Sequence, residues 1–509
     1  MYTLGIDIGT TNIKSVLFKE GALAVSQAIF EYDTFIPRPS WAQQQAEDWW
    51  KGVVATIRRV LTDSRIDAAG ISALAISCQA PTMLPVDKSG KPLYPALIWM
   101  DRRSGEQCGE LSNKVGFQRI FETTGNRVDP FYMLSKLLWF RENYPSLYEK
   151  TYKILSPNGY VNLKLTGEYS LDLVNASLTQ AYDVLSHSWS KELLNAAGVE
   201  LSIFPSVMAS HFSIGRVSHS AASITGLKQG TTVLAGTVDG AAAALEAGIF
   251  GDGIAAEMTG TSSVLLMSSL SPKTSLNLTY MYSAVPGQHL LLGPMSSTGA
   301  SLKWFRDELY RSKGADSYSR IDDEVAKNAK TPTGIVFLPY LAGERAPIWD
   351  SDARGTFIGI TLCTNRSQIM RSIMEGSAFA LRDNIEEMIR AGSSPRIIRI
   401  VGSHTKSDIW LKIKASVLNR EIEVVSASLG APKGLAYILG LHTGEFTSIE
   451  EASRNCLNID RRIEPIKEWI EAYEDLFISY KSIYAHLKND FASMARLLSR
   501  NRVENKTRG

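Results

Sequence analysis

The chain is poor in the features that mark several classes of protein. It has only four cysteines, Cys78, Cys108, Cys363 and Cys456, and none shows the short spacings of a metal site. No stretch approaches the roughly 18 apolar residues of a membrane-spanning helix. A β-strand pattern begins at Tyr2 without a charged segment before it, so no signal peptide is expected. These absences predict a cytoplasmic protein with reduced thiols.

The chain also lacks an excess of charge of either sign. Its 54 Lys and Arg residues against 52 Asp and Glu residues leave a formal net charge of +2. This balance gives no electrostatic reason to expect binding to nucleic acid or to an anionic membrane. The basic stretch 487–509 is expected to be a frayed helix and tail. Because a single core stops growing at roughly 250–300 residues, two domains are expected in a chain of 509 residues.

What the chain does have is a turn near its start that is rich in small and hydroxyl-bearing residues. Apolar β-formers lead to Gly9-Thr10-Thr11-Asn12, and a second β-rich run, 13–18, leaves it. This pattern predicts a hairpin whose backbone N–H groups and hydroxyls can surround an anion. Asp7 lies on the entering strand, where it could reach a metal ion bound to that anion. An ordinary hairpin fits the same pattern equally well.

A second copy of this arrangement lies about half a chain downstream. Residues 255–267 again have the pattern of strand, turn and strand, with the turn at Gly260-Thr261-Ser262-Ser263. The two copies predict a duplicated domain with one phosphate loop in each half. A phosphate chain held between two such lobes is what an ATPase with a closing cleft requires.

Polar groups follow predicted strands in the first half. The strand 71–77 leads to Gln79, and a short strand leads into Trp99-Met-Asp-Arg-Arg103. Because ligand sites of α/β folds lie at the carboxyl ends of strands, these two loops are expected to face one site. Asp239 follows the strand 232–235 and opens an alanine-rich helix. Locally, a helix-capping role would be its commonest use.

The second half carries the most specific motifs. Pro339-Tyr-Leu-Ala-Gly-Glu-Arg-Ala-Pro347 precedes Gly355-Thr-Phe-Ile-Gly-Ile360 and Gln368-Ile-Met-Arg-Ser-Ile-Met-Glu375. Together with Trp99-Met-Asp-Arg-Arg103 and Ser135-Lys-Leu-Leu-Trp139, they resemble the FGGY family of carbohydrate kinases, within the actin-like (ribonuclease H-like) ATPase superfamily. The resemblance covers the chain from Leu4 to about Gly444.

The resemblance implies an α/β fold of two duplicated actin-like ATPase domains with a cleft between them. The first domain, 1–247, would hold the sugar site and the first phosphate loop. The second domain, 248–490, would hold the second phosphate loop and the nucleotide site. Residues 491–509 would form a C-terminal tail. The implied reaction is ATP-dependent phosphorylation of a sugar hydroxyl, with ATP and Mg²⁺ as cofactors. The implied partners are a small-molecule sugar and ATP, with no nucleic acid or membrane, and a homodimer is left open.

The resemblance also assigns residues to roles. Asp239 matches the catalytic base that takes the proton from the sugar hydroxyl, and Asp7 matches the carboxylate that positions Mg²⁺. A helix N-terminus is expected to keep Asp239 ionised at neutral pH. The expected sugar-binding residues are Gln79, Trp99, Asp101, Arg102 and Asp239. The expected nucleotide-binding residues are Thr10, Thr11, Lys14, Gly260, Thr261, Gly402 and Gly434.

Three departures from the family pattern concern the substrate and the nucleotide. The usual triple glycine reads Gly402-Ser403-His404, and His404 is expected to be a surface or capping residue. Ala80-Pro81 follow Gln79 where xylulokinases and gluconate kinases usually carry Met-His, and the Gln-Arg-Glu of glycerol kinases is absent. Pro157-Asn158-Gly159-Tyr160 stands where Pro-Lys-Asp-Tyr is usual.

Several interpretations stay open at this point. The leading one is a xylulokinase-like kinase of a ketopentose. The alternative is a gluconate kinase or another sugar or polyol kinase of the same family. The other classes are an actin- or chaperone-like ATPase that drives a protein partner, and a non-catalytic sugar-binding regulator. Retention of both Asp7 and Asp239 speaks against the regulator.

Overall fold

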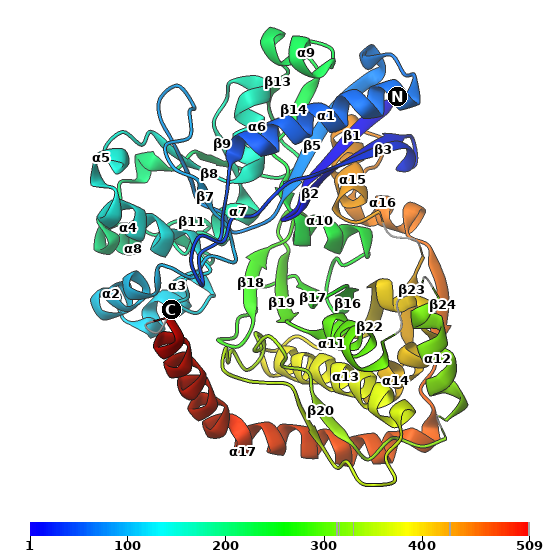
Figure 1. Ribbon diagram of the computed structural model, residues 1–509. Helices are drawn as coiled ribbons and strands as arrows, with labels where there is room; N and C mark the ends of the chain where they lie inside the picture. The colour runs from blue at the N-terminus through cyan, green and yellow to red at the C-terminus, as the bar shows by residue number, and fades with distance from the viewer. Residues whose placement is uncertain (312–313, 315, 329, 427–428, 507–509) are drawn as a thin grey trace. The chain divides into compact units, whose positions relative to one another are not determined.

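The computed structural model describes residues 1–506 except 312–313, 315, 329 and 427–428, and only the backbone of 498–506 (Figure 1). The chain divides into two compact units. Unit 1 comprises 1–252, 268–290 and 428–457, and unit 2 comprises 253–267, 291–427 and 458–509. Two segments from the second half of the chain, 268–290 and 428–457, therefore belong to the unit that contains the N-terminus.

The sheet of unit 1 has the strand order β13-β14-β5-β1-β2-β3 (Figure 1). Its strands are β1 (Tyr2–Ile8), β2 (Asn12–Lys19), β3 (Leu23–Glu31), β5 (Ile71–Cys78), β13 (Ser213–Arg216) and β14 (Thr232–Leu234). The first three strands form an antiparallel meander, β5 is parallel to β1, and β14 is parallel to β5. The edge strand β13 is antiparallel to β14, and β15 (Thr237–Val238) also pairs with β5.

The second sheet repeats this plan. From β19 onward its order is β19-β17-β16-β22-β23-β24, with β18 at the outer edge. Its strands are β16 (Ile254–Thr259), β17 (Ser263–Ser269), β18 (Thr279–Tyr282), β19 (His289–Met295), β22 (Ile397–Gly402), β23 (Ile422–Val425) and β24 (Ile459–Ile463). As in unit 1, a hairpin (β16–β17) is followed by two parallel neighbours and an antiparallel edge strand. This repeat in order and direction confirms the duplicated actin-like α/β fold.

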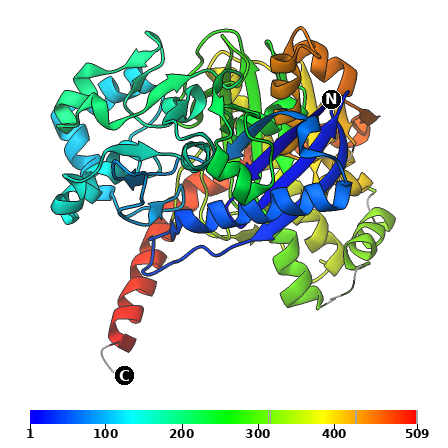
Figure 2. The same ribbon diagram turned by 90° about the horizontal axis from the view of Figure 1, so that it is seen from above.

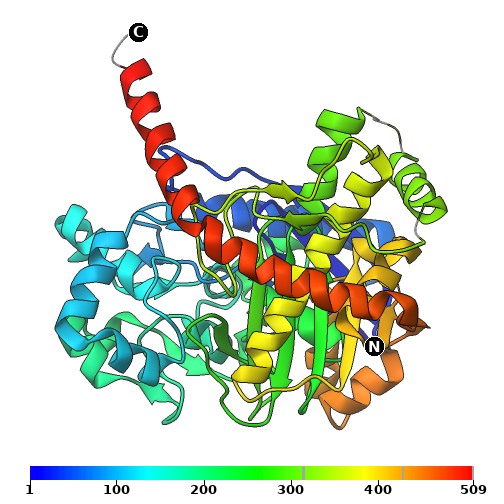
Figure 3. The ribbon, with the colours of Figure 1, turned by 90° about the horizontal axis from the view of Figure 1, so that it is seen from below.

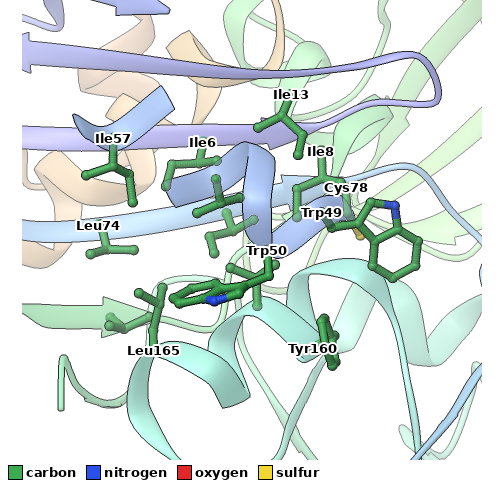
Figure 4. Close-up of a cluster of buried hydrophobic side chains, with 14 of the residues drawn as sticks. Ile6, Ile8, Ile13, Trp49, Trp50, Ile57, Leu74, Cys78, Tyr160 and Leu165 are labelled. Carbon is green, nitrogen blue, oxygen red and sulfur yellow. The ribbon is translucent and has the colours of Figure 1, made fainter. Parts of the chain in front are cut away.

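Helix α1 (Ala46–Ser64) covers one face of the first sheet, as Figure 2 shows beside the blue strands. Trp49, Val53 and Ile57 recur every four residues and are fully buried, as the apolar periodicity predicts. They pack with Ile6 and Ile8 of β1 in a hydrophobic core cluster of unit 1, part of which Figure 4 shows. This packing fixes β1, and with it the turn that follows it.

The connection between β5 and β14 contains many short elements. They are β6 (Leu84–Val86), β7 (Ala96–Leu97), α2 (Gly105–Val115), α3 (Phe117–Thr124), α4 (Met133–Asn143), α5 (Pro145–Tyr148), β8 (Lys153–Leu155), α6 (Pro157–Thr166), β9 (Ser170–Asp172), α7 (Leu173–Ser177), β10 (Tyr182–Asp183), β11 (Ser188–Trp189), α8 (Lys191–Ala197), β12 (Ser206–Met208) and α9 (His219–Thr225). β4 (Gln43–Gln44) pairs with β7. α10 (Asp239–Glu246), α15 (Ala431–Thr443) and α16 (Ile449–Cys456) complete unit 1.

Unit 2 is built around one long buried helix. α13 (Arg366–Arg390) begins at a capping box formed by Asn365 and Gln368. The first part of α17 (Lys467–Lys506) runs beside α13 and α14 (Asp408–Leu418), and its C-terminal part extends away from them, as Figure 3 shows. The remaining elements are α11 (Thr298–Trp304), α12 (Ser317–Lys327), β20 (Val336–Leu338) and β21 (Thr356–Ile358). Across the described part of the chain, no helix combines the length and apolar character that crossing a membrane requires.

Candidate active site

The turn between β1 and β2 is held by its carbonyl groups. The Tyr32 hydroxyl donates a hydrogen bond to Gly9 O, and Gln44 Nε2 donates to Thr10 O at 2.8 Å. In a trans peptide the N–H group points opposite to the C=O group of the same plane. The amides of Thr10 and Thr11 are therefore turned away from Tyr32 and Gln44. Successive N–H groups on one side of a turn suit the oxygens of a phosphate.

Asp7 lies on β1 directly before this turn. Its Oδ1 accepts a hydrogen bond from Ser77 Oγ at 2.7 Å, because Asp7 and Ser77 are partners in the parallel pairing of β1 with β5. Burial raises the pKa of Asp7 to about 6, against the lowering effects of Ser77 and Lys14. Lys14 lies opposite Asp7 on β2, and its ammonium group donates to Leu429 O at 2.8 Å.

Asp239 is the first residue of α10. The residue at the N-cap position is Val238, so Asp239 does not occupy the capping position that local sequence suggests, and its Oδ1 accepts from the Gly240 amide at 2.6 Å. Burial, and after it the charge of Asp7, raise the pKa of Asp239 to about 7. The helix N-terminus therefore does not hold the pKa of Asp239 low, because burial and Asp7 raise it.

Asp7 and Asp239 fit a Mg²⁺ site of the kind that acts on nucleotides. Mg²⁺ prefers carboxylate oxygens and is usually held by one or two of them, together with waters and substrate phosphates. Burial raises the pKa of both carboxyls, and the lowering effect of Lys14 on Asp7 does not offset it. Among the described residues no cluster of three or more His, Cys, Asp or Glu side chains exists that could hold a metal by itself. The pair thus suits a cation that arrives with a phosphate ligand.

Gln79 and Trp99 both reach the residues around the first turn. Trp99 Nε1 donates to Thr10 Oγ1 at 3.0 Å, and Gln79 Nε2 donates to Gln44 Oε1 at 2.6 Å. Gln79 is 1% exposed, and its Oε1 has no hydrogen-bond partner among the described residues. The structure therefore brings Gln79, Trp99 and the turn together within unit 1.

Asp101 and Arg102 make different contacts from each other. The Asp101 carboxylate accepts from the Ala42 amide at 2.6 Å and from Arg103 Nε at 2.9 Å, and the Asp101–Arg103 pair is fully buried. Arg102 forms two hydrogen bonds with Asp129, and its side chain is 42% exposed. The structure thus gives Asp101 a role in holding its loop, and its direct contact with a sugar remains a prediction.

Lys136 adds a buried cation to this region, and its role was not predicted from the sequence. The side chain is fully buried on α4, and its ammonium group donates to Phe131 O. Burial lowers the pKa of Lys136 to about 7, although Asp101 and Asp129 oppose this effect. The Ser135–Trp139 motif indicates the helix, but it does not reveal that all residues from Met133 to Phe140, Lys136 included, are buried.

The second hairpin turn lies in unit 2 and abuts the start of α11. The Ala300 amide donates to Thr261 O at 2.8 Å, and a Cβ on Gly299 would lie 2.1 Å from Gly260 O. Gly402 has φ +100°, and a Cβ there would lie 2.3 Å from Thr259 O. The structure thus brings Gly260, Thr261 and Gly402 together at the end of β16.

His404 is buried, so the prediction of a surface or capping residue is wrong. Its ring stacks on Trp410 with 3.9 Å between ring centroids, and its Nδ1 lies 3.0 Å from Lys414 Nζ, which is paired with Glu257. Burial and Lys414 hold the pKa of His404 well below its usual range. The ring fills space beside the second turn, which explains why a histidine is tolerated after Gly402.

Gly434 has a packing role that requires no ligand. It lies on α15 within unit 1, and a Cβ there would be 1.8 Å from Ala242 O of α10. Only glycine allows the two helices to approach so closely. Its assignment to adenosine binding remains a prediction.

Together, the duplicated sheets, the two hairpin turns and the paired carboxylates define the actin-like class of phosphotransferases. Comparison with known families gives the narrower identity. A model of the FGGY family of carbohydrate kinases, N-terminal domain, matches residues 2–246, and the C-terminal domain model matches residues 255–441. The chain therefore belongs to the FGGY family of carbohydrate kinases and is an ATP-dependent sugar kinase, as the sequence motifs predict.

Relatives with different named substrates resemble the chain to a similar degree. The xylulose kinase of Bacillus subtilis is 28% identical over 490 residues, covering 96% of this chain and 97% of that protein. The gluconokinase of the same organism is 27% identical over 504 residues, covering 97% and 98%. The crystal structure of xylulose kinase from Rhodospirillum rubrum matches with a TM-score of 0.91 and 27% identity, covering 97% of this chain and 100% of that one.

Proposed function

We propose that the sugar substrate is a ketopentose and that the reaction runs at Asp7 and Asp239. The observation that carries the site assignment is the position of these two carboxylates near the ends of β1 and β15, which both pair with β5. They lie beside a turn in which Gly9 O and Thr10 O accept hydrogen bonds from Tyr32 and Gln44. The choice of a ketopentose is supported by the similarity to xylulose kinases along nearly the whole chain.

In the proposed reaction each side chain has a separate task. The sugar hydroxyl gives its proton to the Asp239 carboxylate as its oxygen bonds to the γ-phosphorus of ATP, and the bond to the ADP oxygen breaks. Mg²⁺, when bound, neutralises phosphate charge. Asp7 would hold the ion, and the amides of Thr10 and Thr11 would hold phosphate oxygens. Lys14, Gly260, Thr261, Gly402 and Gly434 stay assigned to the nucleotide.

The protonation of the pair fits this division of labour. With a pKa near 7, Asp239 is close to the pH at which a general base combines availability with driving force. A cation held at Asp7 would weaken the repulsion between the two carboxylates, which after burial is the second cause of the raised pKa of Asp239.

A sugar acid is the second candidate substrate, because cationic groups lie in the region of the predicted sugar loop. The Arg102 side chain is partly exposed, and the buried Lys136 lies near Asp101. An aldonate carboxylate would add an anion to this set, and the gluconokinase relative has such a substrate in its name.

The experiment that tests the substrate is ADP release in a coupled assay across pentuloses, hexuloses, pentitols and aldonates. We expect the largest kcat/KM with a ketopentose. A larger value with an aldonate would replace the ketopentose by the second candidate. Absence of sugar-dependent ADP release with every member of the panel would contradict the ketopentose proposal and the aldonate alternative together.

A further inference from the structure

The Gln44 side chain links the predicted sugar loop to the first phosphate turn. It is fully buried on β4, and all four hydrogen-bonding positions of its amide are used. Its Nε2 donates to Thr10 O at 2.8 Å and to Thr34 Oγ1 at 2.7 Å. Its Oε1 accepts from Trp49 Nε1 at 3.0 Å and from Gln79 Nε2 at 2.6 Å. A glutamine amide has two donor and two acceptor positions, so no hydrogen-bonding position of this side chain is unused.

The chemistry of the partners fixes the orientation of this amide. The indole N–H of Trp49 can only donate, so the atom facing it is Oε1. The backbone carbonyl of Thr10 can only accept, so the atom facing it is Nε2. The contacts of Oε1 and of Nε2 therefore require the same orientation of the amide. A flipped amide would place Nε2 against the Trp49 donor and Oε1 against the Thr10 carbonyl acceptor.

The orientation of Gln79 follows from that of Gln44. Because Gln44 presents an acceptor, Gln79 must present its Nε2, and its Oε1 is left facing the other way. That oxygen is buried and has no hydrogen-bond partner among the described residues. Buried polar atoms are rarely left unpaired, so a donor from a ligand is the natural partner.

We propose that Gln44 is a positioning residue that couples sugar binding to MgATP binding. It sets Gln79 so that Oε1 accepts a hydrogen bond from a sugar hydroxyl, and the same amide holds the Thr10 carbonyl so that the turn faces phosphate. The proposal rests on the proposed function, since it needs a sugar at Gln79 and a nucleotide at the turn. It adds that the group recognised by Gln79 is a hydrogen-bond donor, which a hydroxyl is and a carbonyl oxygen is not.

The substitution Gln44→Glu separates the two halves of this link. A carboxylate keeps one oxygen for Trp49 and Gln79, but its other oxygen would face Thr10 O, which repels it. We expect the Kd for MgATP, measured without sugar, to rise at least tenfold. The matched control is Gln45→Glu, because Gln45 is the exposed neighbour and receives the same charge. The control should leave that Kd within twofold of wild type.

The substitution Gln44→Met tests the coupling itself. Methionine keeps the length and bulk of the side chain but removes all four hydrogen bonds. In the wild type, saturating sugar should tighten MgATP binding, and in Gln44→Met that ratio should fall toward one. Thermal unfolding of each variant checks that it folds. If Gln44→Met does not fold, Thr34→Val, which removes one acceptor of the Gln44 amide, should reduce the ratio by a smaller factor.

The outcomes distinguish this inference from the proposed function. A wild-type protein that turns over no sugar contradicts the proposed function. A wild type that is active, with folded Gln44→Met and Thr34→Val variants that retain the full effect of sugar on MgATP binding, overturns the coupling role of Gln44. A stability loss alone, with the ratio unchanged, assigns Gln44 to the core and also overturns the proposal.

Discussion

Asp7 raises the pKa of Asp239, which burial has already raised, to about 7. The two residues lie near the ends of segments on either side of β5, because β1 and β15 both pair with that strand. Their proximity therefore follows from strand order and not from a flexible loop. Two carboxylates held in this way titrate together, and the charge of Asp7 adds to the effect of burial on the pKa of Asp239.

The first prediction concerns the chemistry of Asp239. Asn in its place keeps the size and can still accept from the Gly240 amide, but it cannot take up a proton usefully. Since general-base assistance is typically worth about 10²–10⁴ in rate, kcat of Asp239→Asn should fall by about that factor. Binding of sugar and MgATP should be retained. A kcat within a few-fold of wild type would remove Asp239 from the mechanism.

The second prediction concerns how stability depends on pH. Because the folded-state pKa of Asp239 is about 7 and the ordinary value is 3.8, the folded protein binds more protons than the unfolded chain between these values. The contribution of Asp239 to stability therefore falls as pH rises from about 4 to 7. Asp239→Asn removes this loss.

The measurement is the thermal midpoint of wild type and Asp239→Asn without Mg²⁺ at pH 5 and pH 8. The thermal midpoint of the variant, relative to that of the wild type, should be higher at pH 8 than at pH 5. An equal difference at both pH values would show that the carboxyl does not titrate in this range. Asp63→Asn, on the exposed face of α1, is a suitable control for loss of a charge.

The third prediction tests the reason for the glycine at position 434. Gly434→Ala would place a methyl group 1.8 Å from Ala242 O, a backbone atom that cannot move alone. Overpacking of this kind costs about 1–3 kcal/mol or more, so the thermal midpoint should fall clearly. The matched control is Gly109→Ala, also within a helix but with no atom within 4 Å of the added Cβ. That change should stabilise by about 0.5–1 kcal/mol. Equal effects of the two changes would contradict the packing explanation.

Much of the site could be predicted because its motifs are local. The turn at Gly9–Asn12 and the helix start at Asp239 can each be recognised from a few consecutive residues, and the repeated strand order confirms the duplication of the hairpin. Gln44 could not be found this way. It lies among three consecutive glutamines, and only the pairing of β4 with β7 decides which of them is buried.

Burial explains the other differences between sequence and structure. The sequence places His404 after a glycine and suggests exposure, whereas the long-range pair of Lys414 with Glu257 creates a buried position for it. The helix position of Asp239 suggests an ionised carboxylate, whereas burial, and after it the charge of the distant Asp7, raise its pKa. Glu257 and Asp7 each lie more than a hundred positions from the residue they affect. The periodicity of apolar residues in the sequence does not reveal such long-range contacts.

The last prediction asks what Asp101 and Arg102 do. Asp101→Ala would leave the buried guanidinium of Arg103 without its carboxylate partner. Breaking a buried ion pair from one side costs about 3–5 kcal/mol, so the thermal midpoint should fall strongly. Because Arg103 and Ala42 hold this loop, KM for the sugar should also rise, while binding of MgATP changes little.

Arg102→Met provides the contrast, since the Arg102 side chain is 42% exposed, and the buried Asp129 carboxylate keeps its hydrogen bond from the Phe131 amide. Its stability cost should be smaller than that of Asp101→Ala, where both partners of the ion pair are fully buried. If Arg102 touches the substrate, KM for the sugar should rise with kcat and stability nearly intact.

Asp101→Asn, which can still accept from Ala42 and Arg103, should recover part of the stability lost in Asp101→Ala. A raised KM in Asp101→Asn at normal stability would instead favour direct contact between Asp101 and the sugar.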